Sequence, residues 1–106
     1  MVAPDRGDLV LITVTGRNDQ APVRRAALVV SPAGYNSRSG LALMCAVATR
    51  SKGYPFEVAL PEGLPVSGVV LADHLRSTDW KARDAEIVSR VPPDVINHVL
   101  AKLKPL

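Results

Sequence analysis

Short apolar segments separated by glycine- and proline-containing turns constrain this fold more than any other feature of the sequence. The longest unbroken apolar run is LALMCAVA, residues 41–48, and the segment at 9–15 is rich in β-branched residues. Segments of this length and composition are typical of β-strands. We therefore predict six short strands, over residues 9–15, 24–31, 41–48, 56–60, 68–80 and 82–91.

The predicted strands differ in how much of their surface is apolar. Residues 24–31 suit a largely buried strand, and residues 41–48 suit a strand that is buried on both faces. The segment 68–80 is apolar up to Ala72 and polar afterwards. This change predicts that the strand bends out of the core.

The last segment, residues 92–103, has helical periodicity. Its two initial prolines suit a helix start, because the first backbone N–H groups lack partners in any case. An apolar stripe with i, i+3, i+4, i+7 spacing is formed by Ile96, Val99, Leu100 and Leu103. The connection at 32–40 has room for one further helical turn, around Tyr35 and Asn36. This order of elements predicts a mainly β fold, a small and strongly bent β-barrel with a C-terminal helix packed on it.

The length and composition favour one soluble domain. A chain of 106 residues suits a single core, so we assign residues 1–106 to one domain. Its hydrophobic content of 47% is enough for a folded core. Charged residues at Asp5, Arg6 and Asp8 do not suit a secretory signal, and the run at 41–48 is too short to span a bilayer. We therefore expect a cytoplasmic protein that does not bind a membrane.

The sequence does not indicate a metal site or a cofactor. The single cysteine, Cys45, excludes a disulfide framework and a thiolate metal site. Two widely separated histidines, His74 and His98, do not supply the ligands of a zinc site. No glycine motif for a nucleotide cofactor is present. We expect no cofactor and no metal.

Basic residues gather at three places in a chain of net charge +3. The clusters are Arg24 with Arg25, Arg50 with Lys52, and Arg76 with Lys81 and Arg83. Each cluster taken alone also suits an ordinary solvated surface. The turn TRSKGYPFEV, residues 49–58, adds Tyr54 and Phe56 to its two cations. That combination suits a chain of phosphates with bases to stack.

Arginine and hydroxyl side chains are the remaining candidates for chemistry. Arginine stays protonated, so its natural role is to stabilise charge on a phosphate in a transition state. The candidate groups are Arg25, Ser31, Thr49 and Ser51, with Asp73 and His74 elsewhere in the chain. Such a set suits cleavage of RNA, with the 2′-OH of the RNA as nucleophile and no metal.

Four stretches of the sequence resemble the MazF/PemK family of toxins. They are GDLVLITV from Gly7, RRAALVVSPAGYN from Arg24, SKGYPFEV from Ser51 and GVVLADHLRSTDWKAR from Gly68. The resemblance implies a PemK/CcdB-type barrel, a homodimer, and a sequence-specific, metal-independent endoribonuclease for single-stranded RNA. The implied products are a 2′,3′-cyclic phosphate and a free 5′-OH. The implied antagonist is an antitoxin with an acidic, disordered tail.

The resemblance also implies roles for individual residues. Arg25 matches the catalytic arginine of the family, and Asp73 matches an aspartate that reads a base. The catalytic threonine of the family falls on Ala48, so its hydroxyl is missing. Thr49 is the candidate replacement, although neighbours on a strand face opposite sides. The other candidates for RNA contact are Arg24, Asp19, Gln20, Arg50, Ser51, Lys52, Tyr54, His74, Arg76 and Arg83.

The missing hydroxyl at Ala48 keeps two other interpretations open. One is a non-catalytic toxin that poisons a protein target, and the other is an RNA-binding barrel that cleaves very slowly or not at all. Arg25 and the basic turn favour the ribonuclease.

Overall fold

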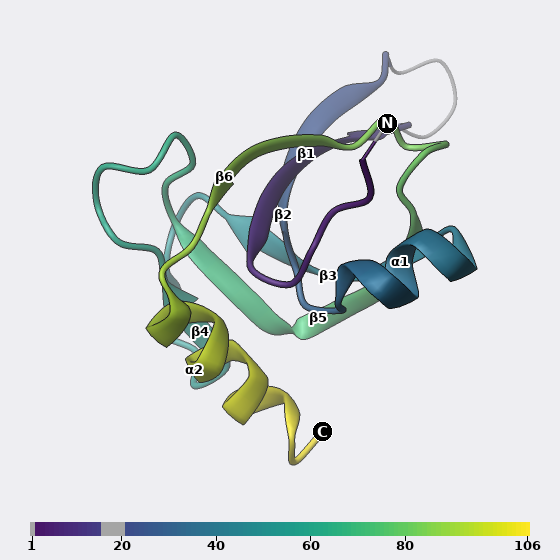
Figure 1. The fold of residues 1–106 in the computed structure, drawn as a ribbon. Helices are drawn as coiled ribbons and strands as arrows, with labels where there is room; N and C mark the ends of the chain where they lie inside the picture. Colours follow the sequence, from purple (N-terminus) through teal and green to yellow (C-terminus); the bar gives the residue numbers. More distant parts are fainter. Residues whose placement is uncertain (1, 16–20) are drawn as a thin grey trace.

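One curved antiparallel sheet organises the molecule. The computed structural model describes residues 2–15 and 21–106. The strands lie in the order β4-β5-β3-β2-β1-β6, and Figure 1 shows them curling into a half-barrel, with α2 beside β4. The elements are β1 Asp8–Val14, β2 Val23–Val29, α1 Ala33–Ser39, β3 Leu41–Ala48, β4 Glu57–Ala59, β5 Val69–Asp79, β6 Glu86–Arg90 and α2 Pro93–Leu103. The predicted bent β fold with a C-terminal helix is confirmed.

Alternation along the strands buries both faces of the sheet. On β1, Leu9 belongs to one core cluster and Val10 to a second, because neighbours on a strand point to opposite faces. The first cluster is covered by α2, which contributes Val95, Ile96 and Val99 to it. The second cluster contains Trp80, which is buried. The sheet is thus the middle layer of the fold.

Strand β3 shows how far the prediction of burial on both faces holds. Cys45 lies in the first core cluster and Met44 in the second, so the prediction is confirmed at the centre of the strand. It is wrong at Leu41, which is 37% exposed, and at Ala46. Leu41 begins the strand, and Ala46 faces a pocket that is described below.

Helix α2 packs as its sequence predicts. Pro92 caps it in an extended conformation, and the helix begins at Pro93. Of the predicted stripe, Ile96 and Val99 are buried, and Leu100 and Leu103 pack partly buried against the same core. The ammonium of Lys102 donates a hydrogen bond to the carbonyl of Pro55, which ties the helix to the turn before β4. In the described ranges, neither helix has the length and apolar character that crossing a membrane requires.

Helix α1 replaces the single helical turn predicted at 32–40 and encloses a buried polar network. Asn36 donates from Nδ2 to the carbonyls of Pro4 and Ser31, at 2.7 and 3.0 Å. The Ser31 hydroxyl donates to Asn36 Oδ1 at 2.6 Å, and Trp80 Nε1 donates to the Asn36 carbonyl at 2.9 Å. The Ser31 hydroxyl is therefore used inside the core, and its candidacy for chemistry is wrong.

The last predicted strand starts later than expected. Residues 81–84 form a turn in which Asp84 has a φ of 54°. Strand β6 therefore begins only at Glu86. The turn places Arg83 beside β1, where the N–H of Thr13 donates to the Arg83 carbonyl at 2.8 Å.

Candidate functional site

Two adjoining pockets form one groove on the sheet, and "the groove" denotes both together. They share Ala48, Leu71 and His74 in their linings. The larger pocket, about 540 Å³, adds the polar side chains of Arg25, Arg76 and Thr78. The smaller, about 230 Å³, adds Arg50, Lys52, Tyr54, Glu57 and Asp73. The larger pocket alone lies within the roughly 300–1,000 Å³ typical of ligand sites.

The period of β2 separates the two neighbouring arginines. Arg25 pairs with Ile12 of β1 and lines the larger pocket. Arg24 points the other way, because successive side chains of a strand alternate between faces. Its Nη1 donates to Thr13 Oγ1 and to the Asp84 carbonyl, both at 2.8 Å, and its Nη2 lies 3.3 Å from Glu86 Oε1. Arg24 therefore ties the edge of the sheet together, whereas Arg25 faces the groove.

An irregularity in β5 brings Asp73 and His74 to the groove. Cys45 of β3 pairs with Leu75, but Val47, only two residues later, pairs with Val70. Strand β5 therefore carries extra residues at this point, and such an insertion bends a strand and turns its side chains. The bend predicted after Ala72 is confirmed. Its effect is that Asp73 and His74, neighbours in the sequence, both line the smaller pocket.

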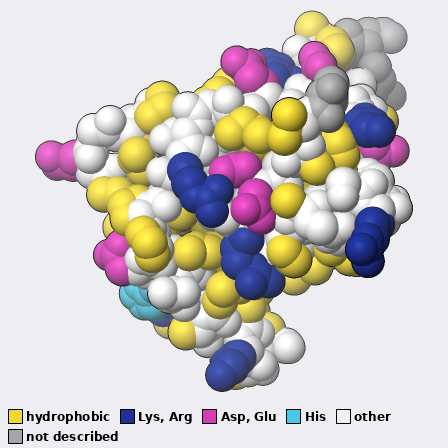
Figure 2. Space-filling model, in the orientation of Figure 1, with side chains coloured by type: hydrophobic (Ala, Val, Ile, Leu, Met, Phe, Trp, Pro, Cys, Tyr) yellow, Lys and Arg dark blue, Asp and Glu magenta, His cyan; other side chains and the backbone are white. Residues whose placement is uncertain are grey.

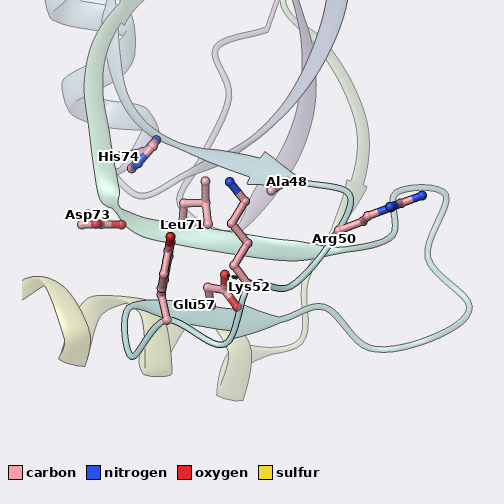
Figure 3. A pocket seen from close by; sticks show the side chains of 8 residues that line it. Ala48, Arg50, Lys52, Glu57, Leu71, Asp73 and His74 are labelled. Atoms are coloured by element: carbon pink, nitrogen blue, oxygen red, sulfur yellow. Dashed lines mark hydrogen bonds between the residues drawn. The ribbon is translucent and has the colours of Figure 1, made fainter.

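Glu57 organises the basic turn from within the groove (Figure 3). The Ser51 hydroxyl donates to Glu57 Oε1 at 2.6 Å. The backbone N–H of Lys52 donates to Glu57 Oε2 at 2.9 Å. The N–H of Gly53 lies 3.3 Å from Oε1. These bonds, the Ser51 bond above all, lower the pKa of the Glu57 carboxyl below its ordinary value. The anchored turn carries Arg50, Lys52 and Tyr54 on one wall of the groove.

Glu57 was not predicted as a site residue from the sequence. Ser51 was assigned to RNA contact, whereas the Ser51 hydroxyl holds the turn through Glu57. One sequence signal could have indicated the role of Glu57. This residue is a carboxylate at the first position of a strand, directly after a turn whose backbone N–H groups need acceptors. Within that turn, Tyr54 is 61% exposed, whereas Phe56 packs partly buried against the core.

The structure gives Thr49 no position in the groove. Strand β3 ends at Ala48, which lines both pockets, and Thr49 lines neither. Gly68, with φ of +123°, fixes this point, because a Cβ there would lie 2.0 Å from the Ala48 carbonyl oxygen. The backbones of Ala48 and Gly68 thus lie in close contact at the point where Thr49 follows β3. Geometry therefore does not support Thr49 as the replacement hydroxyl.

The third predicted basic cluster does not stay together. Arg76 lines the larger pocket with Arg25, whereas the Lys81 ammonium lies 5.3 Å from the centre of the Trp80 ring and Arg83 lies in the turn beside β1. On the face shown in Figure 2, Lys and Arg side chains stand apart, with acidic and apolar side chains between them. The basic side chains that line the groove are thus brought together by the fold. The predicted contacts Asp19 and Gln20 lie outside the described residues.

The arginines of the groove differ in their ion pairing from two other arginines in the described part of the chain. Among the described residues, Arg24 and Arg90 form ion pairs with carboxylates, but Arg25, Arg50 and Arg76 do not. The same part of the chain contains no group of three His, Cys, Asp or Glu side chains that suits a metal ion.

Burial, with the nearby Asp73 charge as the smaller cause, raises the pKa of the Cys45 thiol to about 11. Cys45 is thus an inert core residue.

The family model for PemK-like, MazF-like toxins of type II toxin–antitoxin systems matches residues 5–106. This chain belongs to that family. It is 41% identical to the endoribonuclease toxin MazF of Escherichia coli strain K12 over 105 residues, which cover 97% of this chain and 93% of that protein. It is 33% identical to the endoribonuclease PemK of Escherichia coli over 107 residues, covering 93% of this chain and 78% of that protein.

The fold leads to the same family. A crystal structure of MazE-MazF from Deinococcus radiodurans matches the chain with a TM-score of 0.93 and 51% sequence identity, over 97% of this chain and 94% of that one. A crystal structure of MazF from the same organism matches with a TM-score of 0.87 over the same shares of the two chains. The family resemblance and the fold class predicted from the sequence are both confirmed.

Proposed function

We propose that this chain, an endoribonuclease toxin by family, cleaves single-stranded RNA in the groove without a metal ion. The observation that carries the proposal is one pocket in which Arg25, His74 and Arg76 face an open, partly apolar surface. The relatives named endoribonucleases, at 41% and 33% identity, favour cleavage over a non-catalytic role.

In this proposal Arg25 stabilises the charge that develops during cleavage. The 2′-hydroxyl oxygen of the RNA forms a bond to the adjacent phosphorus, and the bond from phosphorus to the 5′-oxygen breaks. The products are a 2′,3′-cyclic phosphate and a free 5′-OH. Negative charge grows on the non-bridging oxygens, where a guanidinium that stays protonated lowers the barrier. DNA lacks the nucleophile and is not cleaved.

The basic turn positions the RNA in this proposal. Arg50 and Lys52 contact phosphates, which orients the strand without reading its sequence. The exposed ring of Tyr54 offers a stacking surface for a base, worth about 1–3 kcal/mol per stacked base. The Asp73 carboxylate lies in the same pocket and accepts hydrogen bonds from the N–H groups of a base.

An antitoxin is the second ligand that we assign to the groove. The Deinococcus radiodurans chains of similar fold were crystallised as MazE-MazF, so a cognate antitoxin partner is supported for this chain. Free arginines along a groove suit an acidic segment that becomes ordered on binding. Such a segment competes with RNA for the same cations.

A homodimer accounts for the apolar surface that the single chain leaves exposed. Tyr35 and Leu75 are 45% and 40% exposed and line one apolar pocket. Leu41, 37% exposed, begins the strand that pairs with the second half of β5. A second copy of the chain would cover such a surface. Sedimentation at micromolar concentration should show a dimer, and a monomer would contradict this part of the proposal.

Cleavage in excess EDTA tests the proposed function. A long single-stranded RNA and a DNA of the same sequence are incubated with the purified protein, and the ends of the products are mapped. We expect RNA fragments with 2′,3′-cyclic phosphate and 5′-OH ends and intact DNA. Activity that appears only when Mg²⁺ is added, or cleavage of the DNA, would contradict the proposal.

A further inference from the structure

His74 occupies the junction of the two pockets that form the groove. It lines both of them, together with the apolar side chains of Ala48 and Leu71. Figure 3 shows the His74 ring on the same side of β5 as Leu71 and Ala48. A strand of RNA that runs from the Arg25 pocket to the Lys52 pocket therefore passes His74.

The reaction needs a proton at the point where the 5′-oxygen leaves. An alkoxide is a poor leaving group, and a positioned acid that protonates it typically contributes about 10²–10⁴ in rate. The arginines of the groove, Arg25 among them, remain protonated and do not transfer protons. Lysine and tyrosine side chains ordinarily titrate near pH 10 and are weak proton donors at neutral pH.

The other polar groups of the groove are less suited to donate the proton. Glu57 is a carboxylate with a lowered pKa that holds the turn. Asp73 is assigned to the hydrogen bonds with a base in the proposed function, so its carboxyl group is engaged with the substrate. Imidazole is the side chain whose ordinary pKa places both protonation states within reach near neutral pH. His74 is the histidine that faces the groove, whereas His98 lies exposed on α2.

We propose that His74 is the general acid that protonates the departing 5′-oxygen, an inference that rests on the proposed ribonuclease function. The bond from the 2′-oxygen to phosphorus forms while the bond from phosphorus to the 5′-oxygen breaks. The 2′-OH proton leaves to solvent, and the imidazolium of His74 gives its proton to the 5′-oxygen. The neutral imidazole then regains a proton from water. Arg25 stabilises the phosphorane. These reaction steps need no hydroxyl at position 48, where this chain has Ala48.

Replacing the leaving oxygen by sulfur tests this role. A thiolate leaves without protonation, so an RNA with one bridging 5′-phosphorothiolate linkage does not need the acid. Single-turnover cleavage of this RNA and of the matched oxygen RNA is measured for the wild type, His74→Gln, His74→Ala and the control His98→Ala. Affinity is measured separately with an RNA that carries 2′-deoxyribose at the cleavage position.

We expect both His74 variants to lose about 10²–10⁴ in rate on the oxygen RNA and to approach the wild-type rate on the sulfur RNA. His98→Ala should match the wild type on both. An equally active His74→Gln, or an equal loss on both substrates, would overturn the inference while leaving the proposed function intact. A wild-type protein that cleaves neither RNA would overturn the proposed function and this inference with it.

Discussion

The polar groups around Asn36 of α1 and those in the groove are used in opposite ways. Around Asn36, the Ser31 hydroxyl donates to the side-chain amide oxygen, and the amide nitrogen donates to two backbone carbonyls. Trp80 Nε1 donates to the Asn36 carbonyl and completes the network. No buried side-chain nitrogen or oxygen in the described ranges lacks a hydrogen-bond partner. In the groove, by contrast, Arg25 and Arg76 project into an open pocket without a carboxylate partner among the described residues.

This difference separates polar groups that hold the fold from polar groups that are kept for a ligand. A buried polar atom without a partner costs about 1–3 kcal/mol, so a folded protein satisfies such atoms internally. An exposed guanidinium has no such cost because water solvates it. It can therefore remain free until a phosphate displaces the water. Glu57 belongs to both groups. It lines the groove, but its carboxylate oxygens accept hydrogen bonds that hold the turn carrying the neighbouring cations.

Within this comparison of bonded and free polar groups, Arg25 should give the largest effect. Arg25→Ala should lower the single-turnover cleavage rate by about 10²–10³, by analogy with the loss of one oxyanion-hole donor. Arg24→Ala should change that rate far less, because its guanidinium contacts Thr13, Asp84 and Glu86 and does not line the groove. Rates with saturating protein measure both. Equal cleavage by the two variants would contradict the assignment of the groove as the site of cleavage.

The buried network should give the largest effect on stability. Asn36→Ala leaves the Ser31 hydroxyl and the Pro4 carbonyl without their partner, at a cost of about 1–3 kcal/mol for each group left unpaired. Urea unfolding at fixed protein concentration measures the loss, and Asn97→Ala on the exposed face of α2 is the matched control. A variant as stable as the control would show that the network does not hold the fold.

Glu57 should give a smaller effect that depends on pH. Its pKa is lower in the folded protein, chiefly because of the Ser51 hydroxyl, so it adds stability above its unfolded pKa and loses it as the pH falls through the folded pKa. The stability difference between wild type and Glu57→Gln should be constant near neutral pH and shrink below the ordinary value of 4.5. Unfolding measured as a function of pH, with Glu62→Gln as control, tests this. A difference that grows on acidification would contradict it.

The smallest effect is expected at Thr49. Because its side chain lines neither pocket, Thr49→Ala should change the cleavage rate by no more than about twofold, the usual range of a surface substitution. The same single-turnover assay applies. A severe loss would mean that the end of β3 rearranges around Gly68 when RNA binds, and would restore Thr49 as a catalytic hydroxyl.

The sequence was sufficient for the features that depend on local periodicity. The apolar stripe of α2, the two buried faces at the centre of β3, and the bend of β5 after Ala72 all follow from the order of apolar and polar residues. The position of Arg25 was predicted from the resemblance to the family. Each of these features can be predicted from a short segment of the sequence alone.

The rest depends on contacts between distant segments, which periodicity does not encode. The alternation of β2 turns Arg24 away from Arg25, but its ion pair with Glu86, 62 positions away, is known only from the structure. That Thr49 lines neither pocket is likewise seen only in the structure. Glu57 folds back onto Ser51, and the extra residues of β5 appear only when its pairing with β3 is known. The structure therefore corrected the predicted roles of side chains more than the predicted helices and strands that carry them.

The central claim is that the cations of the groove serve a ligand and contribute nothing to the fold. The most direct measurement is the free energy of unfolding of Arg25→Ala, determined by urea at fixed protein concentration on the preparation whose cleavage rate is measured. The account predicts an unfolding free energy within about 0.5 kcal/mol of the wild type together with the loss of cleavage. A variant that is destabilised by more than about 1 kcal/mol, or that retains wild-type cleavage, would contradict it.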